Sequence, residues 1–315
     1  MWQCLHALVS RGVAINPKIR WYRPGSDAGR PSTREQFLLL STRNRTNVRS
    51  RGDHFLKARW FDYVKLVRFP YHLSFIGVVL GILIIDHHWS AKLMRDLSLL
   101  YVSFNVLLYG GLYTINGITD AEADRLHPLK RNRPIASGAV SSGAAATFAF
   151  VLIASGFLTG WAWFGLAVMP VYLLVMALNV SYSLLFRNIP VADIFLNAAT
   201  HPPRFWLGLW LAGGNLVWGW LALVFLFATG ISASRRSVEL DRGSLESRVS
   251  LKKYSTRNLL IVKFAGVVGI LLLWRLNRSS FQLPYIVTFC AYLIFVLGFD
   301  HVPGVRLGFE KLWQM

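Results

Sequence analysis

Charged residues, and acidic ones above all, are scarce in this chain. Asp and Glu number 15 against 34 Lys and Arg, and only 16% of the 315 residues are charged. A soluble domain carries about 25% charged and about 45–50% apolar residues. Here 54% of the residues are hydrophobic and the mean hydropathy is +0.42. The composition excludes an ordinary soluble domain and indicates a protein embedded in a membrane.

Cysteine is nearly absent as well. The sequence holds two, Cys4 and Cys290, and they stand in no cluster with histidines. Two cysteines cannot form a disulfide framework, and no Cys/His group has the spacing of zinc ligands. The sequence therefore excludes both the disulfide-stapled and the zinc-finger classes.

The shortage of acids leaves a formal net charge of +19. Residues 1–60 hold twelve Lys/Arg against three acids, and most of the remaining bases lie in connections between apolar spans. Such loops are where membrane proteins concentrate Lys and Arg. No basic stripe follows a soluble surface, so we expect no nucleic-acid partner. Anionic lipids and phosphorylated substrates are the expected partners.

Residues 1–60 differ in character from the rest of the chain. They are polar, rich in Arg, and lack the apolar core of about 7–15 residues that a secretory signal needs. An organellar transit peptide, a disordered cytosolic arm and a start codon assigned too far upstream are three open interpretations. We predict a disordered basic arm here and a membrane domain over residues 61–315.

The membrane domain is predicted to be an all-α bundle of helical spans. Each apolar stretch is close to the length of about 20 residues that crosses the hydrocarbon core as a helix. The eight expected spans cover residues 69–85, 97–116, 139–158, 161–181, 190–211, 215–231, 259–274 and 284–299. The pairs Gly77/Gly81 and Gly156/Gly160 predict close helix packing.

The distribution of bases predicts the orientation. Connections two, four and six hold 12 Lys/Arg, whereas the opposite connections hold four. The positive-inside rule then places both termini and the basic connections on the cytoplasmic side. We expect a multi-pass protein of a bacterial-type inner or plasma membrane, or of an organellar inner membrane if residues 1–60 are a transit peptide.

A column of oxygen ligands follows the second span. Asn116, Asp120 and Asp124 are spaced i, i+4 and i+8, so on a helix they share one face that drifts by only about 40°. Mg²⁺ is usually held by one or two carboxylates plus substrate phosphates. The plainer alternative is a solvated loop whose acids pair with Arg125 and Lys130. The sequence favours a metal-bridged phosphate site.

Bases follow the acids directly. Lys130, Arg131 and Arg133 stand between Pro128 and Pro134, which restrict the backbone of the loop. Arg binds phosphate through bidentate forks and Lys as a point charge. We expect these three side chains to contact phosphate oxygens as well as to set topology.

Two further connections combine acids and bases. Asp193, Asn197 and Arg204 are predicted to share a face unless Pro202 and Pro203 break the helix. They form either a substrate-facing polar seam or a buried Asp–Arg pair that fastens helices. After the sixth span, a segment that includes Arg235, Arg236, Glu239, Lys252 and Lys253 is either a basic surface segment or a cap over the phosphate site.

Taken together, these motifs resemble the UbiA superfamily of intramembrane prenyltransferases. The first motif of that family, N-D-x-x-D-x-x-x-D, matches Asn116, Asp120 and Asp124. The run from His127 to Ala136 looks like the H-P-x-K-x-x-R-P-I-A of the decaprenyl-phosphate phosphoribosyltransferase branch. The pattern of that branch is also similar at Tyr182, Ser183, Arg187, Asp193, Arg204, Arg235, Arg236, Glu239, Tyr254 and Ser255.

Four features depart from the family pattern. Gly117 replaces the usual first Asp, and only Glu239 and Asp241 stand where aromatic prenyltransferases carry a second D-x-x-x-D. The first span reads Val67-Arg-Phe-Pro-Tyr-His72 and lacks the R-P-x-Q-W-x-K-N of the phosphoribosyl branch. Eight spans are found before the chain stops, whereas the family has nine.

The resemblance implies a UbiA-type enzyme with Mg²⁺ as its cofactor and a polyprenyl (di)phosphate lipid as partner. The expected reaction is transfer of a polyprenyl group from its diphosphate to a small acceptor. One alternative is phosphoribosyl transfer from phosphoribosyl diphosphate to polyprenyl phosphate, and another is a non-catalytic transporter or scaffold. The predicted catalytic residues are Asp120, Asp124, Lys130 and Tyr182; metal ligands, Asn116, Asp120 and Asp124; substrate-binding residues, Asn116, Arg131, Arg133, Arg187, Asp193, Arg204, Arg235 and Arg236.

Overall fold

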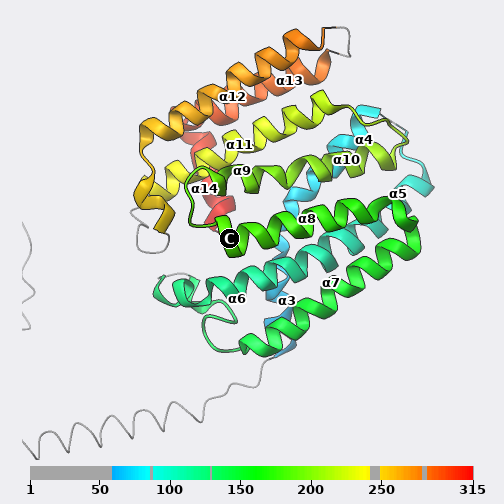
Figure 1. Ribbon diagram of the computed structural model, residues 1–315, viewed down its shortest axis with the longest axis vertical. Coiled ribbons are helices and arrows are strands. Elements are labelled where there is room, and N and C mark those ends of the chain that lie inside the picture. The colour runs from blue at the N-terminus through cyan, green and yellow to red at the C-terminus, as the bar shows by residue number, and fades with distance from the viewer. Residues whose placement is uncertain (1–58, 86–87, 128–129, 242–248, 279–281, 315) are drawn as a thin grey trace, which may run out of the picture. The chain divides into compact units, whose positions relative to one another are not determined.

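The computed structural model describes residues 59–85, 88–127, 130–241, 249–278 and 282–314 (Figure 1). Every regular element in these ranges is a helix, which confirms the predicted all-α class. The basic arm predicted for residues 1–60 lies, apart from its last two residues, outside the described part of the chain.

Two long helical stretches open the membrane domain. The first consists of α3 (Trp60–Leu66), the short helix η1 (Phe69–Phe75) and α4 (Ile76–Ile85). The second consists of α5 (Ala91–Leu100), η2 (Tyr101–Tyr109) and α6 (Gly110–Leu126). The Ser90 side chain accepts from the Leu93 backbone N–H at 3.1 Å and so caps α5. The second stretch carries the acidic motif to one end of the bundle.

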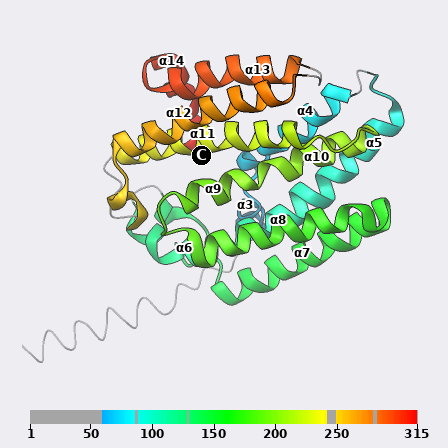
Figure 2. The same cartoon turned by 45° about the horizontal axis from the view of Figure 1, so that its top comes forward.

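The next two spans form a helical hairpin. They consist of α7 (Ser142–Phe164), η4 (Gly165–Val168), α8 (Met169–Ser181) and η5 (Tyr182–Phe186). Gly165 follows α7 with φ of 66°, a value that glycine adopts without strain, and the chain reverses there. Figures 1 and 2 show α7 and α8 side by side. The end of α8 thereby returns to the end of the bundle at which α6 finishes.

The fifth span is broken, as its prolines predict. It consists of α9 (Ala192–Ala199) and α10 (His201–Leu211), which meet at Thr200. Pro202 and Pro203 have no backbone N–H, so the carbonyls one turn earlier lose their helical partners. The break leaves polar backbone groups in the middle of the bundle.

The remaining helices complete the domain. They are α11 (Trp218–Asp241), η7 (Val249–Lys253), α12 (Thr256–Leu276), α13 (Leu283–Tyr292), η8 (Leu293–Leu297), η9 (Gly298–Asp300) and α14 (Pro303–Gln314). The Ser255 side chain caps α12 by accepting from the Asn258 N–H at 3.2 Å. The twelve residues of α14 follow the eighth predicted span as a further helix.

Five helical stretches in the described ranges are long and apolar enough to cross a membrane: Trp60–Ile85, Ala91–Leu126, Ser142–Phe186, Trp218–Asp241 and Thr256–Leu276. The apolar helix Leu283–Leu297 is shorter. The count differs from the predicted eight for three reasons. The stretch 142–186 holds two predicted spans joined at Gly165, the fifth span is split at Thr200, and the eighth is short.

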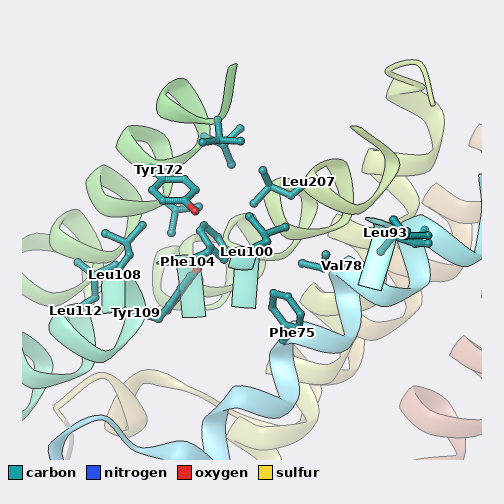
Figure 3. Packing of buried hydrophobic residues seen from close by; sticks show 14 residues of the cluster. Phe75, Val78, Leu93, Leu100, Phe104, Leu108, Tyr109, Leu112, Tyr172 and Leu207 are labelled. Carbon is teal, nitrogen blue, oxygen red and sulfur yellow. The ribbon is translucent and has the colours of Figure 1, made fainter. Parts of the chain in front are cut away.

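Two apolar clusters meet at α10. Figure 3 shows the first, in which Phe104 and Tyr109 of η2 pack near Tyr172 of α8 and Leu207 of α10. The second cluster surrounds Tyr292 and contains Leu209, also from α10. Since α10 contributes buried side chains to both clusters, it lies at the centre of the bundle.

Glycines bring helix backbones together, as the small-residue pairs predict. A Cβ built on Gly81 of α4 would stand 2.3 Å from the carbonyl oxygen of Phe205, and one on Gly208 of α10 would stand 2.0 Å from that of Val78. A Cβ on Gly156 would stand 2.8 Å from the backbone nitrogen of Leu108. The helices α4 and α10 are therefore in backbone contact, which only glycine permits.

Gly81→Ala is expected to lower the stability of the detergent-solubilised protein. The added methyl group would meet backbone rather than a flexible side chain, and overpacking of this kind costs about 1–3 kcal/mol. The thermal unfolding midpoint measures the effect. Gly143→Ala is the matched control, because no atom lies within 4 Å of the Cβ position at Gly143. Equal midpoints for the two variants would contradict the close contact.

Candidate active site

Three connections gather at one end of the bundle. They are the end of α6 with the loop that follows it, the turn between α8 and α9, and the end of α11 with η7; they lie on the left of Figures 1 and 2. The sequence assigns its acids and bases to these connections. Because they share one end, side chains that are far apart in sequence can form one site.

The two acids of α6 each pair with an arginine. Asp124 accepts from Arg133 at 2.7 Å, and Asp120 forms an ion pair with Arg187. The partners predicted for a solvated loop were Arg125 and Lys130; instead, Arg125 donates to the carbonyl of Ala136 at 3.2 Å. The acids are therefore paired with arginines from two different connections, and not with the two bases predicted for a solvated loop.

Asn116 continues this face of α6 towards the membrane. Its side-chain oxygen accepts a hydrogen bond from the Ser183 hydroxyl, which also donates to the Asn179 carbonyl at 2.9 Å. The contact ties α6 to η5, the short helix that follows α8. It also explains how the second connection is held beside the acids.

The loop after α6 is packed against the bundle. Buried Ile135 and Val140 join Ala121 of α6 in an apolar cluster, so the loop backbone is held in place. Lys130 is half-buried, whereas Arg131 is exposed. Burial lowers the pKa of Lys130 below the ordinary 10.5, and the neighbouring charge of Arg133 lowers it further. Lys130 and Arg133 thus lie close enough together for their positive charges to repel, and an anion bound between them would relieve this repulsion.

The acids of α6 retain oxygen atoms for a metal ion. The ion pairs use Oδ1 of Asp120 and Oδ2 of Asp124, which leaves the second oxygen of each carboxylate without a protein partner in the described ranges. No group of three His, Cys, Asp or Glu residues is found there. Two carboxylates and an amide suit Mg²⁺, which completes its coordination with phosphate oxygens and water.

Asp193 lies in a buried network of the other two connections. It is fully buried, accepts from Arg236 at 2.9 Å and from the hydroxyl of Tyr254. Burial, together with the adjacent carboxylate, raises the pKa of that hydroxyl. Arg236 also donates to Glu239 at 2.5 Å. The network fastens α9 to α11 and to the segment before α12.

The two acids at the position of the family's second acidic motif, Glu239 and Asp241, are both paired with arginines. Glu239 accepts from Arg235 at 3.2 Å in addition to Arg236, and Asp241 pairs with Arg306 at 2.8 Å. In the described part of the chain, guanidinium groups therefore neutralise the carboxylates that a second metal ion would need. A second metal ion would have to displace them.

Arg204 does not pair with Asp193, so the buried Asp–Arg pair, one of the two alternatives open from the sequence, does not form between these residues; Asp193 pairs with Arg236 instead. The guanidinium carbon of Arg204 lies 4.1 Å from the ring centroid of Tyr109, and Arg204 donates to Thr200. The break at Thr200 turns α10 away from the face of α9, as the prolines allow. Asn197 of α9 instead donates to Ser232 at 2.8 Å.

Arg68 is a residue of this site that the sequence pattern did not single out. It has φ of 56° and ψ of 54°, a left-handed conformation that is costly for a residue with a side chain. Its Nη2 lies 3.6 Å from the position of a Cβ on Gly117. An arginine thus stands beside the position where the family motif has an acid. A charged residue at the edge of the first span was the available signal.

Tyr182 lies in η5, next to the second connection. Its backbone carbonyl accepts from the Arg187 N–H at 2.9 Å, and its ring is close enough to Arg235 and Arg236 for electrostatic interaction. The structure therefore brings together Asn116, Asp120, Asp124, Lys130, Arg133, Tyr182, Arg187 and Arg235 at one end. Asp193, Arg204 and Arg236 are buried in the bundle, and Arg131 faces outward.

A sequence model of the UbiA prenyltransferase family matches residues 74–301. Among curated proteins, the chain is 30% identical to a decaprenyl-phosphate phosphoribosyltransferase of Corynebacterium glutamicum over 64% of this chain and 66% of the relative, slightly under two thirds of its length. It is 28% identical to the protein of that name from Mycobacterium tuberculosis, over 66% of this chain and 72% of the relative.

The fold matches a solved structure of a UbiA homolog from Archaeoglobus fulgidus, which was bound to GPP and Mg²⁺. The TM-score is 0.65 at 18% sequence identity, and the match covers 80% of this chain and 95% of that chain. At this identity, the likeness establishes the fold.

Proposed function

Because the chain belongs to the UbiA prenyltransferase family, and is thus an integral-membrane transferase, we propose that it moves a polyprenyl group from its diphosphate to a small acceptor with the help of Mg²⁺. The observation that carries this proposal is the pairing of Asp120 with Arg187 and of Asp124 with Arg133. Carboxylates that can bind a metal ion and guanidinium groups that can bind phosphate oxygens lie side by side there, which suits a metal–diphosphate complex. A membrane end of the bundle suits a lipid diphosphate.

The chain's own residues perform the binding and charge compensation. Asp120 and Asp124, with Asn116, would hold the metal ion through the carboxylate oxygens that the arginines leave unused. When bound, Mg²⁺ offsets charge on the two phosphate groups. Arg133 and Arg187 can turn from carboxylate to phosphate oxygens at small cost, because both anions accept bidentate guanidinium contacts.

Departure of the diphosphate is the step at which negative charge develops. As the bond between the allylic carbon and the oxygen breaks, negative charge collects on the leaving diphosphate. Lys130 and Arg133 lie in the loop whose Ile135 and Val140 pack against α6, so the backbone that carries them is held in place while their side chains offset this charge. The acceptor's nucleophilic atom then bonds to the allylic carbon and releases its proton to solvent or to a nearby base.

A second candidate function is phosphoribosyl transfer to polyprenyl phosphate. Two observations favour it: the curated relatives carry that activity in their names, and the run from His127 to Ala136 follows their branch. In this reaction, the lipid phosphate attacks the anomeric carbon of phosphoribosyl diphosphate, and diphosphate again leaves. The arginines at the second acidic position are consistent with a donor that needs one metal site.

The proposed orientation follows from the site. The acids, the bases and the packed loop all lie at the end of the bundle that carries the basic connections. We therefore assign this end to the cytoplasmic side, where phosphorylated substrates are available, under the positive-inside rule.

Paired assays on purified protein test the proposal. One assay supplies a labelled polyprenyl diphosphate with a panel of aromatic and other small acceptors, and the other supplies polyprenyl phosphate with phosphoribosyl diphosphate. Each is run with and without Mg²⁺. Labelled prenyl product in the first assay supports the main proposal, and phosphoribosyl lipid in the second supports the alternative. No product in either assay, from folded protein, would favour a transporter or scaffold.

Lys130 gives the site a characteristic pH dependence. Because its pKa lies below 10.5, the folded protein loses this charge at a lower pH than free lysine does. Affinity for Mg²⁺-diphosphate should therefore fall by about 10-fold on the alkaline side, and Lys130→Arg should move the fall to higher pH. Titration calorimetry between about pH 7 and pH 10 measures it. Identical profiles for the two proteins would exclude Lys130 as the titrating group.

A further inference from the structure

Arg204 is a buried cation in the middle of the bundle. Its side chain lies on α10, which contributes to both apolar clusters, and the residue is only 3% exposed. The ion pairs of the described residues involve other arginines, and none of their carboxylates contacts Arg204. Its Nε has no hydrogen-bond partner in the same part of the chain. The positive charge is therefore not neutralised by the protein.

The surroundings hold this guanidinium in one orientation. Nη1 donates to the backbone carbonyl of Thr200 at 2.6 Å and to its hydroxyl at 3.0 Å. One face of the guanidinium lies over the ring of Tyr109, with its carbon 4.1 Å from the ring centroid. These contacts use one nitrogen and one face, so Nε points its donor elsewhere. An arginine fixed in this way is prepared for a planar oxyanion.

Other polar atoms nearby also have no partner. The hydroxyl of Tyr109, a residue that is 1% exposed, makes no hydrogen bond of good geometry among the described residues, although the side chains of Asn179 and Thr200 lie near it. Asn105 lies four residues earlier on the same helical stretch, is 1% exposed, and both its amide oxygen and its nitrogen are unpaired in those ranges. A polar strip thus runs from Asn116 through Tyr113 and Tyr109 to Asn105, on one side of the second stretch.

Such groups are costly at this location. Buried polar atoms are nearly always hydrogen-bonded, and each unsatisfied one costs about 1–3 kcal/mol. A charged side chain within a membrane span usually pairs or marks a substrate pathway. The unpaired Nε of this guanidinium, together with three unpaired atoms on Tyr109 and Asn105, therefore points to a ligand that supplies both negative charge and hydrogen-bond partners.

We propose that Arg204, with Tyr109, forms a second oxyanion site inside the bundle, separate from the diphosphate site at Asp120 and Asp124. Tyr109 lies seven residues before Asn116, so the new site is about 10 Å deeper. The inference rests on the proposed function for its occupant, a carboxylate or phosphate group of the small acceptor. A molecule about 10 Å long, anchored at Arg204, would reach the diphosphate end with its other end.

Thermal shift titration in detergent tests the site. Wild-type protein is first saturated with Mg²⁺ and inorganic diphosphate, and then titrated with benzoate in one arm and inorganic phosphate in the other. Because a ligand that binds only the folded state raises the unfolding midpoint, the proposal predicts a saturable rise in at least one arm. A rise with benzoate identifies a carboxylate site, and a rise with phosphate a phosphate site.

Three variants assign the rise to Arg204. Arg204→Gln retains a donor to Thr200 without charge, Arg204→Met removes both, and Arg204→Lys retains charge without the planar fork. The apparent Kd should weaken by about 10- to 100-fold for the Gln and Met variants and less for Lys. Arg275→Met, an exposed arginine at the end of α12, is the matched control and should keep the wild-type Kd.

The two proposals fail in different ways. No rise in either arm for wild-type protein, or the same rise in Arg204→Gln, overturns the second oxyanion site. The initial shift with Mg²⁺ and diphosphate is assigned to the first site by its loss in Asp120→Asn and its retention in Arg204→Gln, and its absence from wild-type protein overturns the proposed function. An Arg204-dependent rise supports the second site in either case.

Discussion

Asp120→Asn and Asp124→Asn are each expected to lower kcat/KM by about 10³-fold or more. Each change keeps the size of the side chain but removes the negative charge that a divalent cation needs. It also leaves Arg187 or Arg133 beside a neutral amide, which cannot balance the guanidinium. Steady-state kinetics across a range of Mg²⁺ concentrations measures the loss. The Mg²⁺ concentration for half-maximal rate should rise in both variants.

Glu122→Gln is the matched control for this prediction. Glu122 lies on the same helix between the two acids, but its side chain is exposed. The variant removes one negative charge from α6 without touching the ion pairs, so its Mg²⁺ dependence should equal that of the wild type. Wild-type kinetics in Asp120→Asn would show that the metal assignment is wrong.

Arg236→Met is expected to have the largest effect on stability. Arg236 is buried and bridges Asp193 and Glu239, at 2.9 Å and 2.5 Å. Without it, the fully buried Asp193 carboxylate loses its cation, and removal of one partner of a buried pair costs about 3–5 kcal/mol. The free energy of unfolding, from reversible denaturation in mixed micelles, should fall by this amount.

The double variant Asp193→Asn/Arg236→Met separates the pair from the packing. Since removing both charges avoids an isolated buried carboxylate, the double variant should recover part of the loss. Arg306→Met provides the comparison, because its pair with Asp241 is more exposed and such pairs contribute at most about 1 kcal/mol. A double variant less stable than Arg236→Met would contradict the interpretation of Asp193 as a buried, dependent charge.

The acidic face of α6 could be read from the sequence because it depends on local periodicity. Asn116, Asp120 and Asp124 follow the helical repeat, and no tertiary contact is needed to place them together. The broken fifth span was equally predictable, since Pro202 and Pro203 act through their own backbone. The glycine contacts followed from residue size alone. Each of these features depends on residues within one short segment, so it can be predicted without knowing the tertiary contacts.

The partners of the charged residues were not predictable in the same way. The spacing of Asp193 and Arg204 favoured a shared face, but the break at Thr200 separates them, and Asp193 pairs with Arg236, 43 residues away. Asp120 likewise pairs with Arg187, although other bases are nearer in the sequence. Such choices depend on how three connections meet at one end of the bundle. Arg68 was missed for the same reason, because its importance comes from its position beside Gly117.

The backbone contact between α4 and α10 limits how a lipid can reach the interior. Where Gly81 and Gly208 bring the two helices together, even a methyl group has no room. A polyprenyl tail is several methyl groups wide, so it cannot slip between these helices without forcing them apart. The interface between α4 and α10 is therefore closed to lipid tails, and a tail that enters from the bilayer must pass between other helices. Crosslinking lipid probes to α4 and α10 should leave this interface unlabelled.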